Sequence, residues 1–289
     1  MPVFEQSYPS WSPSRGTRIR WLPVVRRELR QLWEQKPFKI LLIVALFPAV
    51  VHLLQIYSVN KIAAEPNGDL ARALNHVALS IDAEFFFRFL YVQTYFVFVL
   101  LLYASSGLIC DDVRLNLAEV YFSKPLTTRD YLLGKVTTVV GLGLAYTVLP
   151  ALFLFASHAM MVPESSFLRD HWWVPLSALG YGCLIVLPTV LVTLACSSLT
   201  SSRRYAAAAL ITLLAANALI AELLSDVLNR RAVNVISIPQ SILSVGEALF
   251  GVERYLPLDW SWPLGVVTAV TTVGLVVLTR RIQRVEAGL

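Results

Sequence analysis

Six long apolar runs alternate with shorter polar segments along the chain. A hydrocarbon core of about 30 Å is crossed by roughly 20 apolar residues in a helix. The pattern therefore predicts an all-α integral membrane protein with six transmembrane helices, at 38–57, 86–109, 136–160, 173–199, 205–224 and 263–279. The fifth run is rich in alanine. Small residues let helix backbones approach each other, so we expect this span to pack against a neighbouring helix rather than against lipid.

The stretch before the first span is amphipathic. Leucine, valine and tryptophan recur on one helical face and arginine on the other, and Pro23 suits a first helical turn. The apolar face is Leu22, Val25, Leu29, Leu32 and Trp33, and the polar face includes Arg26, Arg27 and Arg30. We expect residues 1–37 to form a cytoplasmic lead-in and an interfacial helix, with Arg26, Arg27, Arg30 and Trp33 at the membrane interface. A soluble amphipathic helix is the alternative. Residues 38–289 then form one six-span domain.

The charges predict the orientation of the chain. If the amino terminus is inside, 17 of the 24 lysine and arginine residues fall on the inner side. This bias predicts a multi-pass protein of the inner (plasma) membrane with both termini cytoplasmic. The composition agrees, with 56% hydrophobic residues, 15% charged residues and a mean hydropathy of +0.64. The net charge of +5 follows from the same bias, so no nucleic-acid partner is expected.

The outer segments differ in length, and the one at 225–262 is the longest. Within it Ile238, Ile242, Val245 and Leu249 recur at helical spacing, after Pro239 and before a glycine at 251. The pattern predicts an outer helix that opens near Pro239 and closes at this glycine. Whether that helix re-enters the membrane or covers the bundle from its surface stays open at this point.

Catalytic and metal-binding patterns are not found in the sequence. The one Gly-Lys pair, Gly134–Lys135, is followed by valine, so the chain has no phosphate-binding loop for ATP. The three cysteines lie in or at the ends of apolar runs and form no CxxC pair. We therefore expect no enzyme activity, metal or cofactor in this chain. Among the polar residues within the spans, Glu222 lies near an outer end and is expected to pair with Arg88.

A charged island at 110–135 separates the second and third apolar runs. Asp111 and Asp112 favour the start of a short helix, because negative charge stabilises a helix amino terminus. The Ser123-Lys124-Pro125 sequence ends that helix, and Thr127 or Thr128 can cap a new one that runs into the third span. A short amphipathic helix at the cytoplasmic face suits docking into a groove of a soluble partner.

This island resembles the coupling segment of permeases of type-2 ABC exporters. The residues that carry the resemblance are Asp111-Asp112, Leu117-Ala118-Glu119, Ser123-Lys124-Pro125-Leu126, Arg129-Asp130 and Tyr131-Leu132-Leu133-Gly134-Lys135. Asn116 departs from the pattern, because many members have glycine there. The amphipathic entry helix, the six spans and the long segment before the last span extend the resemblance over nearly the whole chain.

The resemblance implies a permease that pairs with a second copy or a related permease in membrane lipid, above cytoplasmic ABC ATPase subunits. ATP and magnesium would be bound by the ATPase subunits. The residues implied in ATPase coupling are Asp111, Asp112, Arg114, Leu117, Glu119, Lys124, Pro125, Arg129, Asp130, Gly134 and Lys135, of which Pro125, Gly134 and Lys135 fix the geometry. A membrane scaffold or accessory subunit without its own transport path is the alternative, and the sequence does not identify a substrate.

Overall fold

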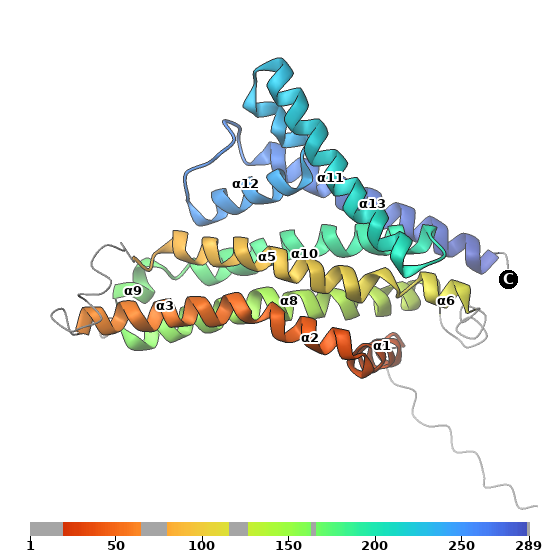
Figure 1. The fold of residues 1–289 in the computed structure, drawn as a ribbon, viewed down its shortest axis with the longest axis horizontal. Coiled ribbons are helices and arrows are strands. Elements are labelled where there is room, and N and C mark those ends of the chain that lie inside the picture. The colour runs from red at the N-terminus through yellow and green to blue at the C-terminus, as the bar shows by residue number, and fades with distance from the viewer. Residues whose placement is uncertain (1–19, 65–79, 116–126, 163–165, 288–289) are drawn as a thin grey trace, which may run out of the picture.

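Helices form every regular element among the residues that the computed structural model describes, which are 20–64, 80–115, 127–162 and 166–287. Figure 1 shows most of them lying along one long axis. In chain order they are α1 (Leu22–Glu34), α2 (Lys36–Ala45), α3 (Phe47–Ala64), α5 (Ala83–Ser106), α6 (Cys110–Arg114), α8 (Thr128–Met161), α9 (Ser166–Asp170), α10 (Val174–Leu199), α11 (Arg203–Leu228), the 3-10 helix η1 (Arg231–Ile236), α12 (Ile238–Phe250) and α13 (Ser261–Ala287).

In the described part of the chain, six helical stretches are long and apolar enough to cross a membrane, as the sequence predicts. They are Lys36–Ile62, Ala83–Arg114, Thr128–Met161, Val174–Leu199, Arg203–Leu228 and Ser261–Arg284. Most extend past the predicted spans, because a helix continues beyond its apolar residues into polar ones. The 34 residues of α8 span roughly 51 Å, more than the hydrocarbon core needs. The chain is thus an all-helical protein with the build of a multi-pass membrane protein.

The centre of the bundle is α10, which packs against α5, α8, α11 and α13. Val186 and Leu194 on α10 have no exposed surface. At the crossing with α8 the two backbones come close at glycines. A Cβ atom on Gly143 would lie 2.7 Å from Val186, and one on Gly182 would lie 2.7 Å from Val148. Small residues are what permit such an approach between membrane helices.

Prolines lie at a break in the first span and inside the third. One glutamine donates hydrogen bonds to backbone carbonyl groups in both spans. The helix breaks between α2 and α3 just before Pro48, whereas Pro150 lies inside α8. The side-chain amide of Gln93 donates to the carbonyl oxygens of Ala45 at 2.8 Å and Tyr146 at 2.7 Å. Tyr146 precedes Pro150 by four residues, and proline has no N–H to pair with that carbonyl. Gln93 therefore joins both interrupted helices to α5.

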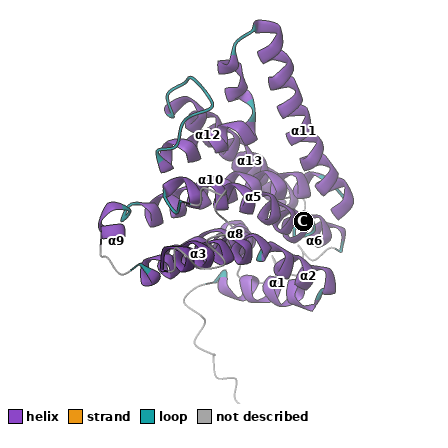
Figure 2. Ribbon diagram, turned by 60° about the vertical axis from the view of Figure 1, so that its left-hand side comes forward, coloured by secondary structure: helices purple, strands orange, loops and turns teal. Residues whose placement is uncertain are grey.

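The fifth span is the least buried of the six. In Figures 1 and 2, α11 rises away from the bundle of α3, α5, α8 and α10. Within this chain its alanines pack against neighbouring helices only in part, since Ala208, Ala215 and Ala216 are exposed, and their packing against a helix of another subunit stays a prediction. The expected pair of Glu222 with Arg88 is wrong. Arg88 instead pairs with Glu84 at 2.6 Å, one turn away on α5.

The helix predicted within 225–262 is present as α12, and its place on the outer side of the membrane stays a prediction. It begins at Ile238, has Pro239 in its first turn, and ends at Gly251, whose φ of 65° is left-handed. Glycine adopts that conformation without the strain that a side chain would cause. The helix packs on α10 and α13, and Ser177 on α10 donates a hydrogen bond to the carbonyl of Leu249 at 2.8 Å. Whether α12 re-enters the membrane or covers the bundle from its surface stays open, because this packing is compatible with both placements.

The α8–α10 crossing gives a test of the packing. Gly143→Val is expected to lower the free energy of unfolding by about 1–3 kcal/mol, because the new side chain overlaps Val186. Gly141→Val, two residues away on α8, meets no atom within 4 Å and is the matched control. The free energy of unfolding of this control variant should change by no more than about 0.5 kcal/mol. Thermal unfolding of both variants in detergent measures the difference. If the two variants lost equal stability, the close approach of α8 and α10 at Gly143 would be contradicted.

Candidate functional site

The predicted coupling segment is described at its two ends, 110–115 and 127–135. At the first end α6 carries Asp111 and Asp112 in its opening turn, as predicted, but this helix ends at Arg114 and does not continue to the predicted break at Ser123. At the second end the Thr127 hydroxyl accepts a hydrogen bond from the Asp130 N–H, and the Asp130 carboxylate accepts one from the Thr127 N–H, both at 3.2 Å. This reciprocal cap confirms the predicted helix start. Leu117, Glu119, Lys124 and Pro125 lie outside the described residues.

A buried lysine joins three elements at this end of the bundle. The ammonium group of Lys135, on α8, lies 2.6 Å from Asp112 on α6 and 2.8 Å from Glu28 on α1. It also donates to the carbonyl oxygen of Leu108 at 2.8 Å. These acceptors match the three protons of a lysine ammonium group. The side chain of Lys135 is 0% exposed and those of Glu28 and Asp112 are 4% and 8% exposed. The Tyr131 hydroxyl adds a hydrogen bond to Asp112 at 2.8 Å.

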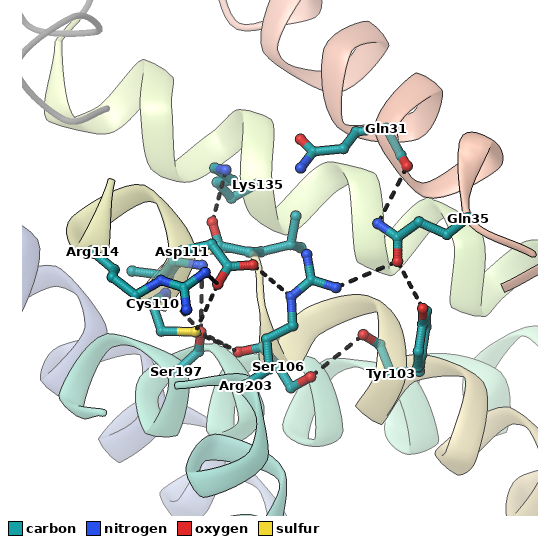
Figure 3. Close-up of polar contacts among 12 residues, drawn as sticks. Gln31, Gln35, Tyr103, Ser106, Cys110, Asp111, Arg114, Lys135, Ser197 and Arg203 are labelled. Atoms are coloured by element: carbon teal, nitrogen blue, oxygen red, sulfur yellow. Dashed lines mark hydrogen bonds and ion pairs between the residues drawn. The ribbon is translucent and has the colours of Figure 1, made fainter. Parts of the chain in front are cut away.

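A second ion pair extends this cluster to α11. The guanidinium group of Arg203, the first residue of α11, binds the carboxylate of Asp111 and reaches the side-chain oxygen of Gln35 at 3.4 Å. The Tyr103 hydroxyl donates to that same oxygen at 2.7 Å. Figure 3 shows Arg203 between Asp111 and Gln35, so the start of α11 is tied to α6 and to the junction of α1 with α2. The Arg203 side chain lies over Gly107, where any Cβ atom would overlap it.

The corner between α5 and α6 is also fastened to α10 (Figure 3). The Ser197 hydroxyl donates to the carbonyl oxygen of Ser106 at 2.7 Å and accepts from the Cys110 N–H at 3.1 Å. These contacts satisfy backbone groups that the break between the two helices leaves without helical partners. We call Glu28, Asp111, Asp112, Lys135 and Arg203, with the corner at 107–110 that they surround, the coupling corner.

The structure separates the predicted coupling residues into buried and exposed ones. Asp112, Gly134 and Lys135 are buried, and the side chain of Asp111 is 14% exposed. Arg114 and Arg129 are exposed, and Asp130 is committed to the cap of α8. Asp112 therefore has internal partners, and any part it takes in coupling is indirect. For Arg114 and Arg129 a contact with an ATPase stays a prediction.

The predicted helix before the first span is present as α1, but its packing face differs from the predicted apolar face. Val24, Glu28 and Leu32 are buried against the bundle. Leu29 is 40% exposed and Trp33 is 61% exposed. The reason is that Glu28 pairs with the buried Lys135, so the face of α1 that carries Glu28 points into the bundle. Arg26, Arg27 and Arg30 lie on the exposed side of α1, and their placement at a membrane interface stays a prediction.

Sequence reasoning missed Glu28 and Arg203. Glu28 does stand four residues from both Val24 and Leu32, so a helical wheel centred on those two would have placed an acid on the inner face. For Arg203 the sequence gives no signal, because its pairing depends on where α11 begins in space. Among the described residues, no group of three or more histidine, cysteine, aspartate or glutamate side chains could hold a metal ion.

The coupling corner is a network of ion pairs and hydrogen bonds between several helices. The carboxylates within it are occupied by cations or hydrogen-bond donors, and it links α1, α6, α8, α10 and α11 in one polar cluster. The chain matches no protein-family model and no curated protein. Its function must therefore be argued from its own geometry.

Removal of the buried lysine tests the cluster. Lys135→Met leaves Glu28 and Asp112 without their shared cation and should cost about 3–5 kcal/mol of unfolding free energy. Adding Glu28→Gln and Asp112→Asn to that variant should recover part of the loss, because the uncompensated charges are gone. Arg129→Met, exposed on the same helix, is the control and should change stability by about 0.5 kcal/mol or less. Thermal unfolding measures all four proteins. No recovery in the triple variant would contradict the ionic account.

Proposed function

We propose that the chain is the membrane-spanning permease subunit of a type-2 ABC exporter. In this proposal a separate cytoplasmic ATPase binds ATP and magnesium and docks on the segment that connects α6 with α8. Closure of the ATPase moves that segment, and the movement rearranges the spans so that a substrate crosses or leaves the membrane. The chain lies in the inner membrane with both termini in the cytoplasm, so that the coupling corner faces the ATPase.

The observation that carries the proposal is the ionic anchoring of the coupling corner. A force applied between Arg114 and Thr127 acts on both ends of the connection, and both ends are bound to other helices. Lys135 passes the force to α1 through Glu28, and Asp111 passes it to α11 through Arg203. Buried ion pairs are poor sources of stability but define geometry well. Such a joint suits a part that must move several helices together.

The exposed residues around the corner favour a partner with acidic groups. Arg114 and Arg129 flank the connection on its solvent side, and neither is buried by the chain itself. The pair that Arg114 forms with Asp111 at 3.3 Å leaves the Arg114 side chain 58% exposed. Both arginines therefore keep exposed surface that a carboxylate-lined groove can contact.

The exposure of α11 supports a second membrane partner. Ala208, Thr212 and Ala216 form an exposed row at intervals of four residues, a spacing that allows close helix contact in lipid. We assign this face to a second copy of the chain or to a related permease. The same exposure favours the second candidate function, a scaffold subunit that assembles other membrane proteins and has no transport path.

Co-purification tests the docking surface. Arg129→Glu should lower the amount of P-loop ATPase that co-purifies with the chain from its native membrane by roughly tenfold, equivalent to about 1.4 kcal/mol. The helix tolerates the change, because a negative charge near its amino terminus is favourable. Arg254→Glu, exposed in the segment that follows α12, is the matched control and should leave the yield unchanged. If no ATPase co-purifies with the chain in any preparation, the exporter proposal is refuted.

ATP turnover separates the exporter from the scaffold. Glu28→Gln keeps the shape of the side chain but removes the charge that binds Lys135, so the ATPase should still co-purify while substrate-dependent ATP hydrolysis falls severalfold. Glu34→Gln, exposed on the same helix, should have no effect. Hydrolysis is measured on the purified complex in lipid nanodiscs. A scaffold without a transport path predicts equal hydrolysis in both variants and in the unchanged chain.

A further inference from the structure

A cavity of about 290 Å³ lies where the fifth span leaves the bundle, between α5, α10, α11 and α12. Its inner wall is closed, since Tyr181 and Ile185 on α10 and Leu210 on α11 are at most 2% exposed. Its outer rim is open, since Tyr95 on α5 and Ile211 on α11 are 58% and 50% exposed. All of these residues lie within apolar spans, so the cavity opens sideways toward lipid.

The lining carries no charged side chain and no histidine. Its polar groups are hydroxyls of tyrosine and threonine. Those of Thr94 and Thr189 donate to the carbonyl oxygens of Leu90 and Ile185, at 2.7 Å each, so they offer a ligand their acceptor side. A charged ligand would be buried here without a counter-ion, which costs far more than burial of a neutral one.

Two tyrosines at the rim supply a hydrogen-bond donor. The hydroxyl of Tyr95 donates to that of Tyr91 at 2.8 Å, and the Tyr91 proton then has no acceptor among the described residues. Both tyrosines line the cavity. A ligand with one neutral acceptor would satisfy Tyr91 while its apolar part fills the space below, which is the usual division of labour in small-molecule sites.

The cavity is mechanically joined to the coupling corner. Arg203 is bound to Asp111, and Leu210 and Leu214, two to three turns along the same helix, form part of the cavity wall. The distance along the helix from Arg203 to Leu214 is roughly 16 Å. A displacement of the first turn of α11 thus moves the wall as well.

We propose that this cavity is the binding site for a neutral, largely apolar ligand that carries one hydrogen-bond acceptor, such as a hydroxyl or carbonyl oxygen, and that enters from the membrane. As the substrate class of the transporter, this assignment rests on the proposed function. The binding itself depends only on the cavity of this chain.

Photolabelling of the purified full chain in nanodiscs tests the site. Benzophenone is neutral, accepts a hydrogen bond through its ketone and reacts with nearby C–H groups on illumination. Labelled peptides are identified by mass spectrometry over a range of probe concentrations. Saturable labelling is expected on the peptides that contain Tyr91, Thr189 and Leu214. The carboxylate 4-benzoylbenzoic acid has the same core with a charge, and it should label these peptides at least about tenfold less.

Variants locate the labelling. Leu214→Trp fills the cavity and should reduce saturable labelling about tenfold, whereas Leu213→Trp, next to it on α11 but outside the cavity, should not. Tyr91→Phe, at an exposed rim position that does not threaten folding, should weaken labelling by about two- to tenfold through the lost hydrogen bond. Tyr57→Phe is its exposed control. A diazirine-bearing hexadecanol that labels the same peptides more tightly than benzophenone would identify a lipid-derived source.

The outcomes are separable. Labelling that rises linearly with probe, or is equal in Leu214→Trp and the unchanged chain, overturns the binding site. A co-purifying ATPase with no saturable labelling likewise overturns the site and leaves the exporter intact. Saturable labelling with no ATPase in any preparation overturns the substrate assignment and the proposed function, and it leaves a membrane-facing binding site.

Discussion

The structure depends on a lysine that has no exposed surface. Moving an ammonium group out of water costs several kcal/mol even after the protein relaxes, so Lys135 is tolerated only with Glu28, Asp112 and the Leu108 carbonyl around it. Those partners come from two separate parts of the chain, α1 and the corner between α5 and α6. The requirement to surround one charge therefore fixes where α1 lies, where α5 ends, and which face of α8 points inward.

That constraint turns local contacts into a connection across the bundle. Because α1 is bound through Glu28 and α11 through Arg203, the two helices at the margins of the bundle share one corner. The corner is also fastened to the central helix α10 through Ser197. Movement of α6 without movement of α8 would break the buried ion pair between Asp112 and Lys135, so the two helices are expected to move together.

The sequence predicts what depends on local pattern and misses what depends on which helices meet. Apolar runs gave the six spans, the periodicity around Val245 gave α12, and the threonine cap gave the start of α8. Glu28 was missed because hydropathy ranks a single acid on a basic helix as a surface residue. Arg203 and the course of α11 could not be predicted, because alanine content permits close packing without specifying the partner.

The position of α11 unites the corner, the cavity and the exposed alanine row in one argument. A helix that served only to hold the bundle together would bury its small residues within the chain, yet α11 buries two residues near each of its ends and leaves Ala208 and Ala216 outside. Its first residue is fixed to the coupling corner and its next turns form a wall of the cavity. Its free face can therefore meet a second membrane subunit without disturbing either attachment. In the proposed exporter, a change at the coupling corner would alter the cavity and the contact with a second permease together, as a pair of coupled permeases requires.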